Sequence, residues 1–487
     1  MLGMKYEIEL QILLIILLAA WLSILIVRRR TRSGIATVQE RRFESAIRTF
    51  AVELDAFKFA PQQAVKVLLR HDHVISEAIE KMEREENEDP KTLRLRVYHY
   101  LEEIVPFFRP LMYYRVGYWI SHSILNFLFK IEYDEQDLAR IKREASKGNR
   151  ITVYVCNHRS NADFVILPYV LRDNVALSFA VGEWARVWPL DVLFKSFGSY
   201  FIRRGCRDKL YHIVLRRYVQ LVTKNGVTQA MFPEGGLSRD GFLREPKLGL
   251  IDSMVTAKED RSFQREIVFV PVGINYDRVL EDRNLIGELK PKKKKSTKLE
   301  MLGRVLKISF SNVHKFSRGE IRKNGIASLR FGDPISFDAW QREAAPSLFE
   351  MDKYDRRANL AEFVNQVQAS IAAQIPVTPL TLVATVLDKH PQLTRDALVE
   401  QLEHYLAAFE EAGATVVYKE KGLAWIADGA LLRLGIRKIV VKGEATYRVT
   451  PESRDLVSYY AKSVSHHLGE AVPMCQLPDY ATKTSTT

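Results

Sequence analysis

The feature that most constrains the fold is an alternation, in the middle of the chain, between short β-rich runs and longer helical patterns. The β-rich runs are ITVYVC (151–156), VTQAMF (227–232), IVFVPV (267–272) and VLKISF (305–310), and a helical pattern occupies 209–223. Strands that alternate with helices predict an α/β domain with a largely parallel sheet. Ligands bind such sheets beyond the carboxyl ends of the strands, so residues that directly follow these runs are the first candidates for a site.

Five regions follow one another along the 487 residues, a length that suits roughly three domains. We expect a membrane anchor at 1–34, a helical region at 35–95, interfacial or hairpin helices at 96–138, the central α/β domain at 139–342 and a mostly helical C-terminal domain at 343–487. The expected fold class is therefore α/β with a mostly parallel central sheet, flanked by helical regions on both sides and preceded by one transmembrane helix.

The segment from Gln11 to Val27 contains no charged residue, and it is close to the lower limit of about 17 residues for crossing a bilayer. Arginines follow at positions 28, 29, 30 and 32. By the positive-inside rule, this asymmetry predicts a single-pass protein of the cell membrane with the rest of the chain in the cytoplasm. A cleaved signal peptide would need its basic residues before the apolar run, so we expect an uncleaved anchor.

A second apolar region, 104–133, is rich in aromatic residues and is interrupted by Pro106, Arg109, Pro110 and Arg115. These interruptions argue against a full membrane span. A mixture of aromatic, basic and aliphatic residues is typical of a helix that lies in the bilayer interface. A buried helical hairpin beneath the central domain is the alternative, and the sequence leaves both open.

The formal net charge of +13 favours anionic partners such as nucleic acid, anionic lipid or phosphorylated metabolites. No zinc-finger spacing or RNP motif supports nucleic acid, and no cluster of metal ligands is apparent. The three cysteines form no CxxC pair, which fits a reducing compartment. The basic stretch Lys290–Lys298 is interpreted as a solvated loop or as a contact for anionic lipid or an acidic partner.

The first cluster with chemical potential is Asn157-His-Arg-Ser-Asn-Ala-Asp163, directly after ITVYVC. On one continuous helix, His158 and Asp163 would point about 140° apart, so they meet only if His158 lies in the loop and Asp163 in the first helical turn. A carboxylate bonded to one ring nitrogen fixes the tautomer and leaves the other nitrogen as a base. The alternative is a surface histidine with an aspartate that stabilises a helix N-terminus.

The second cluster is a pair of arginines, Arg203 and Arg204, which leave the aromatic strand of Gly198–Ile202, with Lys209 close behind. Arginine binds a phosphate through two parallel hydrogen bonds. The pair therefore suits a phosphate ligand, and a basic pair on the surface at a strand end is the alternative.

The third cluster, within 232–249, combines polar groups with a glycine pair. Glu234 can accept hydrogen bonds from hydroxyl groups, while Gly235 and Gly236 allow backbone to approach a ligand closely. The groups that could bind an anion are Ser238, Arg239 and Lys247. An ordinary glycine-rich turn is the alternative.

The fourth cluster, Val270–Asp277, places Pro271 inside a buried strand. Proline removes a ladder hydrogen bond and is disfavoured in a central strand. Its presence predicts either a local kink that shapes a pocket or an edge strand.

In their order and spacing, these four clusters resemble the four blocks of the glycerolipid acyltransferase superfamily, in particular its glycerol-3-phosphate 1-O-acyltransferase branch. Phe201-Ile-Arg-Arg204 and Glu234-Gly-Gly-Leu-Ser-Arg239 distinguish this branch from the lysophosphatidate branch. The resemblance covers 104–340 and extends weakly to Val457–Tyr460 and His466–Leu468.

The resemblance implies that 139–342 is an acyltransferase domain, with His158 as the catalytic base and Asp163 as its orienting carboxylate. It also implies a block linked to the acyl donor at Pro271, and a glycerol 3-phosphate site formed by Arg203, Arg204, Glu234, Gly235, Ser238 and Arg239. The family commonly has arginine where this chain has Leu237. One phosphate contact is therefore either missing or supplied by Lys209 or Lys247.

The implied reaction moves an acyl group from acyl-CoA or acyl carrier protein to the 1-hydroxyl of glycerol 3-phosphate, without a covalent intermediate, a metal or another cofactor. Lysophosphatidate or dihydroxyacetone phosphate is the alternative acceptor. A covalent route would need Cys156 or Ser160 as a nucleophile, but no Gly-x-Ser-x-Gly elbow is present, and Cys156 ends an apolar strand. A non-catalytic membrane protein that binds anionic lipid is the alternative from another class, and its function would not depend on His158.

Overall fold

The computed structural model describes residues 57, 60–110, 112–145, 149–171, 177–186, 190–289 and 325–476. The expected anchor at 11–27, the basic stretch at 290–298 and the run VLKISF at 305–310 lie outside these residues. Among the helices that the structure describes, none is both long and apolar enough to cross a membrane.

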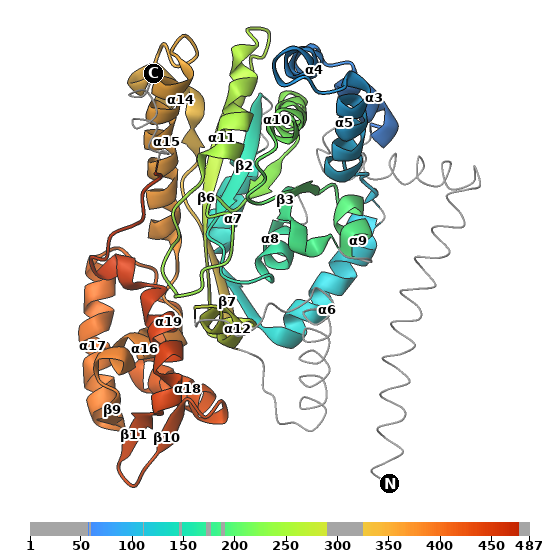
Figure 1. The fold of residues 1–487 in the computed structure, drawn as a ribbon. Helices are drawn as coiled ribbons and strands as arrows, with labels where there is room; N and C mark the ends of the chain where they lie inside the picture. The colour runs from blue at the N-terminus through green and yellow to red at the C-terminus, as the bar shows by residue number, and fades with distance from the viewer. Residues whose placement is uncertain are drawn as a thin grey trace, which may run out of the picture.

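An eight-stranded sheet forms the centre of the molecule (Figure 1). Its order is β1-β7-β6-β2-β5-β3-β4, and β8 also pairs with β6. In the described part of the chain the pairs are parallel, except those of β6 with β7 and β8. This arrangement confirms the expected α/β fold with a mostly parallel central sheet. The strands are β1 (Lys130–Tyr133), β2 (Arg150–Cys156), β3 (Ser178–Gly182), β4 (Tyr200–Ile202), β5 (Gln229–Met231), β6 (Glu266–Tyr276), β7 (Ile326–Phe331) and β8 (Ile335–Ser336).

The sheet buries both of its faces, because alternate side chains of a strand enter two different apolar cores. In β2, Val153 and Val155 belong to one core, and Tyr154 and Cys156 to the other. A strand buried on both faces has a near-continuous apolar sequence, which explains why ITVYVC was recognisable. The first core also includes α10 (Lys209–Lys224), α11 (Leu248–Val255), α14 (Phe337–Ala344) and α15 (Lys353–Gln374), and the second α6 (Tyr118–Leu128), α7 (Glu135–Ala145) and α8 (Asp163–Leu171).

Pro271 lies in β6, a central strand that borders β2 on one side and β7 and β8 on the other. Pairing with β7 ends at Phe331, and pairing with β8 begins at Ile335. Three partner residues therefore oppose Val270 and Pro271, and the Pro271 carbonyl accepts the N–H of Gly332 at 2.9 Å within this bulge. The bulge explains why proline is tolerated here, so the edge-strand alternative is wrong.

In the described part of the chain, the helices α3 (Gln62–Arg70), α4 (His73–Glu86) and α5 (Pro90–Ile104) pack on one another and on α10. The charged stretch Glu83–Pro90 contains the exposed end of α4, an irregular connection at 87–89 and the start of α5. Its helices are defined by local signals, since Asp89 caps α5 by accepting two backbone N–H groups and Pro90 occupies a first-turn position that needs no donor.

Region 104–133 contains a π-helical turn, Met112–Gly117, which leads into α6 and then into β1. Leu125 of α6 is buried in the core, whereas Trp119 and Ile124 are 60% and 46% exposed. The helix therefore has one face on the core and large apolar groups directed outward, and β1 joins the central sheet as a parallel partner of β7.

A C-terminal domain follows α15, and Figure 1 shows it below α15 and beside α12 (Asp282–Gly287). Its central helix, α16 (Pro379–Lys389), is buried over most of its length. It packs against α17 (Arg395–Glu411), α18 (Leu423–Ile436) and α19 (Arg454–Lys462). A small antiparallel sheet completes the domain, with β9 (Gln392–Thr394), β10 (Val440–Lys442) and β11 (Thr446–Val449).

Candidate active site

A buried histidine–aspartate pair lies at the carboxyl end of β2. His158 lies in the loop after the strand, and Asp163 is the first residue of α8. This arrangement brings the imidazole Nδ1 to 2.9 Å from Asp163 Oδ2, with both side chains at most 1% exposed. The strand–loop–helix turn thus creates the geometry that a single helix could not.

The Asp163 carboxylate is held by more than the imidazole. Its Oδ2 also accepts the backbone N–H of Arg159 at 2.8 Å and of Ser160 at 3.0 Å, and its Oδ1 accepts the Tyr276 hydroxyl. These donors fix the carboxylate at the helix N-terminus, where a negative charge is also stabilised by the macrodipole. Its position, and hence that of the ring, is fixed by the backbone.

The His158 ring stacks on Phe232, with ring centroids 4.0 Å apart, and meets the edge of Phe164. Among the described residues, its Nε2 has no hydrogen-bond partner. Burial lowers the pKa of His158; the Asp163 carboxylate opposes this effect, while the charges of Arg204 and Arg244 add to it. The neutral ring can therefore accept a proton at Nε2.

Glu234 joins the loop after β5 to the His158 loop. One carboxylate oxygen accepts the N–H of His158 at 3.2 Å, and the other accepts the N–H of Arg244 at 3.1 Å. Burial raises the pKa of Glu234 to about 8, against the opposing effect of these N–H groups and of the charge of Arg159. The carboxylate that we expected at the acceptor thus also braces two loops, through its bonds to these two backbone N–H groups.

Ser238 strengthens the same connection. Its N–H donates to the carbonyl of His158 at 3.1 Å, and its buried hydroxyl donates to the carbonyl of Phe242 at 2.7 Å. The serine that we expected to hold a phosphate therefore closes the loop after β5 on itself and on the His158 loop.

Two guanidinium groups flank Gly236. A Cβ atom placed on this glycine would lie 2.5 Å from Arg244 Nη1 and 3.4 Å from Arg204 Nη1. A side chain here would force the end of the Arg244 side chain to shift, so glycine allows the two guanidinium groups to come this close. Gly235 has φ +64° and lies against the aliphatic part of Lys247, which is exposed.

Arg203 and Lys209 form ion pairs away from the guanidinium groups of Arg204 and Arg244. Arg203 binds Glu103 of α5 through Nε and Nη2, at 2.6–3.1 Å, and lies over the rings of Tyr100 and Tyr211. Lys209 forms an ion pair with Glu86 at 2.9 Å. The structure thus connects both cations, which we expected at the phosphate, to the N-terminal helices.

Arg239 is the third expected cation, and it binds Glu288 at 2.7 Å. It still lies close enough to Arg204 to lower the pKa of that guanidinium, together with Arg244 and after the larger effect of partial desolvation. Among the arginines and lysines that we expected at the phosphate, Arg204 alone has a guanidinium without a described ion pair and also a charge that acts on His158, within the described part of the chain.

The two alternative nucleophiles are unsuited to a covalent route. Cys156 is fully buried, and burial, with a contribution from the Asp163 charge, raises the pKa of its thiol well above the usual range. The Ser160 hydroxyl donates to Glu281 at 2.8 Å and makes no described hydrogen bond with His158.

Sequence reasoning missed four residues that shape the site: Asn157, Tyr276, Glu281 and Arg244. The Asn157 amide exchanges two hydrogen bonds, of 2.9 and 2.8 Å, with the backbone of Ile274, which ties β2 to β6. Asn157 and Tyr276 lie within the first and fourth clusters, so a signal was present for both. Arg244 lies within the third cluster, although nothing in that pattern singled it out, and no local pattern marked Glu281.

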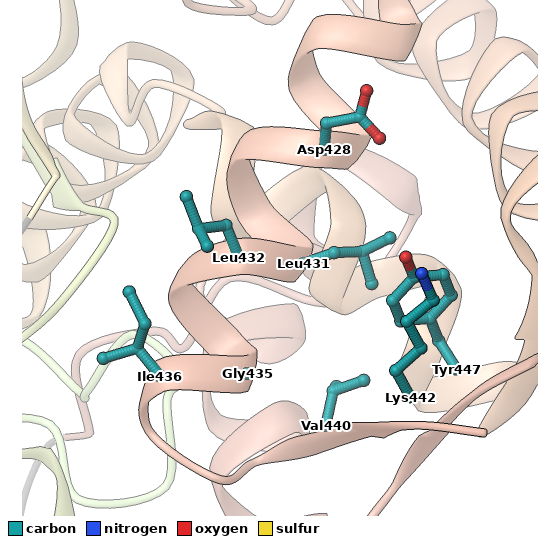
Figure 2. Close-up of a pocket in the computed structure, with 8 residues that line it drawn as sticks. All are labelled: Asp428, Leu431, Leu432, Gly435, Ile436, Val440, Lys442 and Tyr447. Atoms are coloured by element: carbon teal, nitrogen blue, oxygen red, sulfur yellow. The ribbon is translucent and has the colours of Figure 1, made fainter.

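A surface hollow of about 310 Å³ lies elsewhere, between α18 and the strands β10 and β11 of the C-terminal domain (Figure 2). Asp428 at its rim is paired with Arg395 at 2.8 Å, and its walls include Leu432 and Ile436. Its lining contains no histidine and no pair of unpaired cations. The candidate active site is therefore the one around His158.

Comparison with known proteins gives two family matches. Residues 135–275 match the family model described as Acyltransferase, and residues 309–472 match the model described as Glycerol-3-phosphate acyltransferase C-terminal region. These two regions are thus similar to an acyltransferase domain and to the C-terminal region of glycerol-3-phosphate acyltransferases. These matches confirm the resemblance drawn from the four clusters.

Curated relatives carry the same name. The glycerol-3-phosphate acyltransferase of Aeromonas hydrophila is 31% identical over 353 residues, which is 69% of this chain and 41% of that protein. That of Glaesserella parasuis serovar 5 is 29% identical over 370 residues, 72% of this chain and 43% of that protein. This chain thus spans about two-fifths of the length of these relatives. A crystal structure of the 1-acyl-sn-glycerophosphate acyltransferase of Thermotoga maritima is 16% identical, covering 63% of this chain and 97% of that one, with a TM-score of 0.29.

Proposed function

We propose that this chain transfers a fatty acyl group from a thioester donor to the 1-hydroxyl of glycerol 3-phosphate and so makes lysophosphatidate for phospholipid synthesis. The observation that carries the proposal is the His158 imidazole, held at Nδ1 by Asp163 and without a described partner at Nε2, beside the guanidinium groups of Arg204 and Arg244. The family matches and the names of the relatives support the same acceptor.

The geometry suits general base catalysis. Nε2 of His158 removes the proton of the acceptor hydroxyl as its oxygen attacks the thioester carbonyl. The carbon–sulfur bond then breaks, and the thiol leaves with the proton returned by the imidazolium. Asp163 stabilises that imidazolium and keeps the ring oriented. A positioned base contributes about 10²–10⁴-fold, and orientation of the acceptor by the cationic pair supplies a further part.

We further propose that the donor is acyl-CoA or acyl carrier protein and that the protein works at the bilayer, with its catalytic domain on the cytoplasmic side. The uncharged segment Gln11–Val27 and the arginines after it support this placement. The outward Trp119 and Ile124 of α6 favour the interfacial interpretation of 104–133, because large exposed apolar groups suit a bilayer surface.

The test is an acyl-transfer assay with the purified full-length protein, labelled glycerol 3-phosphate and either acyl-CoA or acyl carrier protein loaded with the acyl chain. We expect turnover by the wild type and a loss of about 10²–10⁴-fold in His158→Ala. The matched control is His404→Ala, since His404 lies exposed on α17, and it should keep wild-type activity.

Competition between acceptors separates the alternatives. A preference for lysophosphatidate or dihydroxyacetone phosphate over glycerol 3-phosphate would reassign the acceptor. The wild type could instead transfer no acyl group and bind anionic vesicles as well as the His158→Ala variant does. That result would favour a non-catalytic lipid-binding protein over the enzyme.

A further inference from the structure

The missing phosphate contact at Leu237 has a substitute in this chain. The family resemblance places an arginine at that position, and Lys209 and Lys247 were the cations expected to replace it. Lys209 is paired with Glu86. Leu237 is partly buried against the apolar core that includes α8, so this position contributes packing rather than charge.

Arg244 lies on the opposite side of the same loop, and its backbone is fixed at both ends. Its N–H donates to Glu234 at 3.1 Å, and its carbonyl accepts the side-chain amide of Gln368 on α15 at 3.1 Å. Glu234 also binds the His158 N–H, so one carboxylate sets the positions of both Arg244 and the catalytic loop.

From this anchored backbone the Arg244 side chain reaches Gly236, where its guanidinium lies close to that of Arg204. A Cβ atom placed on Gly236 would lie 2.5 Å from Arg244 Nη1 and 3.4 Å from Arg204 Nη1. The two Nη1 atoms are therefore no further apart than the sum of these distances. One phosphate group can span such a separation and accept hydrogen bonds from both guanidinium groups.

Neither guanidinium group forms an ion pair in the described part of the chain, although the buried Glu234 carboxyl interacts electrostatically with Arg244. Nearby arginines do have partners: Arg203 binds Glu103 and Arg239 binds Glu288. Glu183 affects the pKa of Arg204, but the two side chains form no described ion pair. The two positive charges repel each other and lie next to the proposed base. A dianionic ligand that binds between them would remove this repulsion.

We propose that Arg244 binds the acceptor phosphate jointly with Arg204, in place of the arginine that this chain lacks at position 237. This inference rests on the proposed function and makes Arg244 an acceptor-specificity residue. Lys247 is the competing candidate, because its ammonium is exposed and has no described partner. The positive charges that act on His158 are those of Arg204 and Arg244, and Lys247 is not among them. Arg244 is therefore favoured over Lys247.

The experiment measures binding separately from turnover. Full-length His158→Ala protein is titrated calorimetrically with glycerol 3-phosphate, alone and with Arg244→Gln, Arg244→Lys or Lys247→Gln added. We expect Arg244→Gln to raise Kd about 10- to 100-fold, the range for loss of charge-assisted hydrogen bonds. Arg244→Lys should be intermediate, because it keeps the charge and loses the fork, and Lys247→Gln should stay close to the parent.

A parallel series with His158 intact should show a higher KM for the acceptor in Arg244→Gln and an unchanged KM for the acyl donor. An unchanged Kd in folded Arg244→Gln, or a weakening confined to Lys247→Gln, overturns the inference. If Arg244→Gln fails to fold, a Kd for Arg244→Lys equal to that of the parent overturns it as well. Tight acceptor binding without turnover by the wild type would instead contradict the proposed function and leave the role of Arg244 in place.

Discussion

Asp163 shows how much a single carboxylate can organise. It accepts hydrogen bonds from the His158 ring, from the N–H groups of Arg159 and Ser160 and from the Tyr276 hydroxyl. Because these donors come from the loop after β2 and from the neighbouring strand β6, the carboxylate orients the imidazole and also ties that loop to β6. Its loss is therefore expected to affect both the tautomer of the base and the shape of the loop.

The acid limb of the pH profile should report the charges around His158. Burial lowers the pKa of the ring, and Arg204 and Arg244 add to that effect, so the neutral, active form persists below the ordinary histidine pKa of about 6.5. Removing one positive charge by Arg204→Gln raises this pKa, and the acid limb of kcat/KM should move to higher pH. Arg239→Gln is the control, since Arg239 is paired with Glu288; equal limbs in both variants would contradict this account.

Glu234→Gln tests the brace between the two loops. Glutamine offers one acceptor oxygen where the two N–H groups of His158 and Arg244 need two, and its amide then faces a donor. An unsatisfied buried donor costs about 1–3 kcal/mol, so we expect kcat/KM to fall about 10-fold or more and Tm to fall with it. Glu245→Gln, in the same loop, should leave both nearly unchanged, and similar losses in the two variants would contradict a specific brace.

At the scale of elements, the loop after β5 and helix α19 approach each other at Gly241. This residue has φ +101°, and a Cβ atom on it would lie 2.1 Å from the carbonyl oxygen of Tyr459. Arg159, which follows His158, donates to the Gly241 carbonyl and lies over the Tyr459 ring. The histidine loop, the glycine-rich loop and a C-terminal helix thus meet at one point.

Gly241→Ala should therefore be strongly destabilising. The strained φ and the backbone collision act together, and each costs about 1–3 kcal/mol, so we expect a loss of at least about 2 kcal/mol with reduced activity. Gly249→Ala is the matched control, because a Cβ atom there meets nothing within 4 Å and alanine suits a helix better than glycine. Thermal unfolding of both variants measures the difference, and equal Tm values would show that the approach at Gly241 is not tight.

At the scale of the whole molecule, a buried ion pair joins the C-terminal domain to the acyltransferase domain. Arg437 binds Asp282 of α12 at 2.6 Å, and the Tyr460 hydroxyl donates to the same carboxylate at 2.5 Å. The side chains of Arg437 and Asp282 are 11% and 4% exposed. Because water has little access to this contact, removing either charged partner is expected to lower the free energy of unfolding.

Asp282→Ala should lower the free energy of unfolding by about 3 kcal/mol or more, because it leaves Arg437 buried without a counter-charge. Asp428→Ala removes the exposed partner of Arg395 in the same domain and should change Tm little. Thermal unfolding followed by limited proteolysis of the C-terminal domain checks the contrast, and equal effects would show that the domain does not depend on the buried pair.

Sequence predicted the parts of this molecule that have local causes. The run ITVYVC was recognisable because its strand is apolar on both faces, and His158 with Asp163 was recognisable because one turn brings them together. The partners of the arginines are set by tertiary contacts, which no local pattern encodes. Arg203 and Arg204 are neighbours in sequence, yet Glu103, which is 100 residues away, binds only the first. Arg244 lies in the third cluster, but its approach to Arg204 depends on tertiary contacts.

The contact between Gly241 and Tyr459 has a consequence for recombining this chain with its relatives. A chimera joined near position 342 would combine a glycine-rich loop from one parent with a helix from another, at a place where backbone touches backbone. Such a hybrid inherits a mismatch that no side-chain repair can relieve. Exchanges that keep the His158 loop, the glycine-rich loop and the last helices from the same parent are the ones expected to yield folded, testable hybrids.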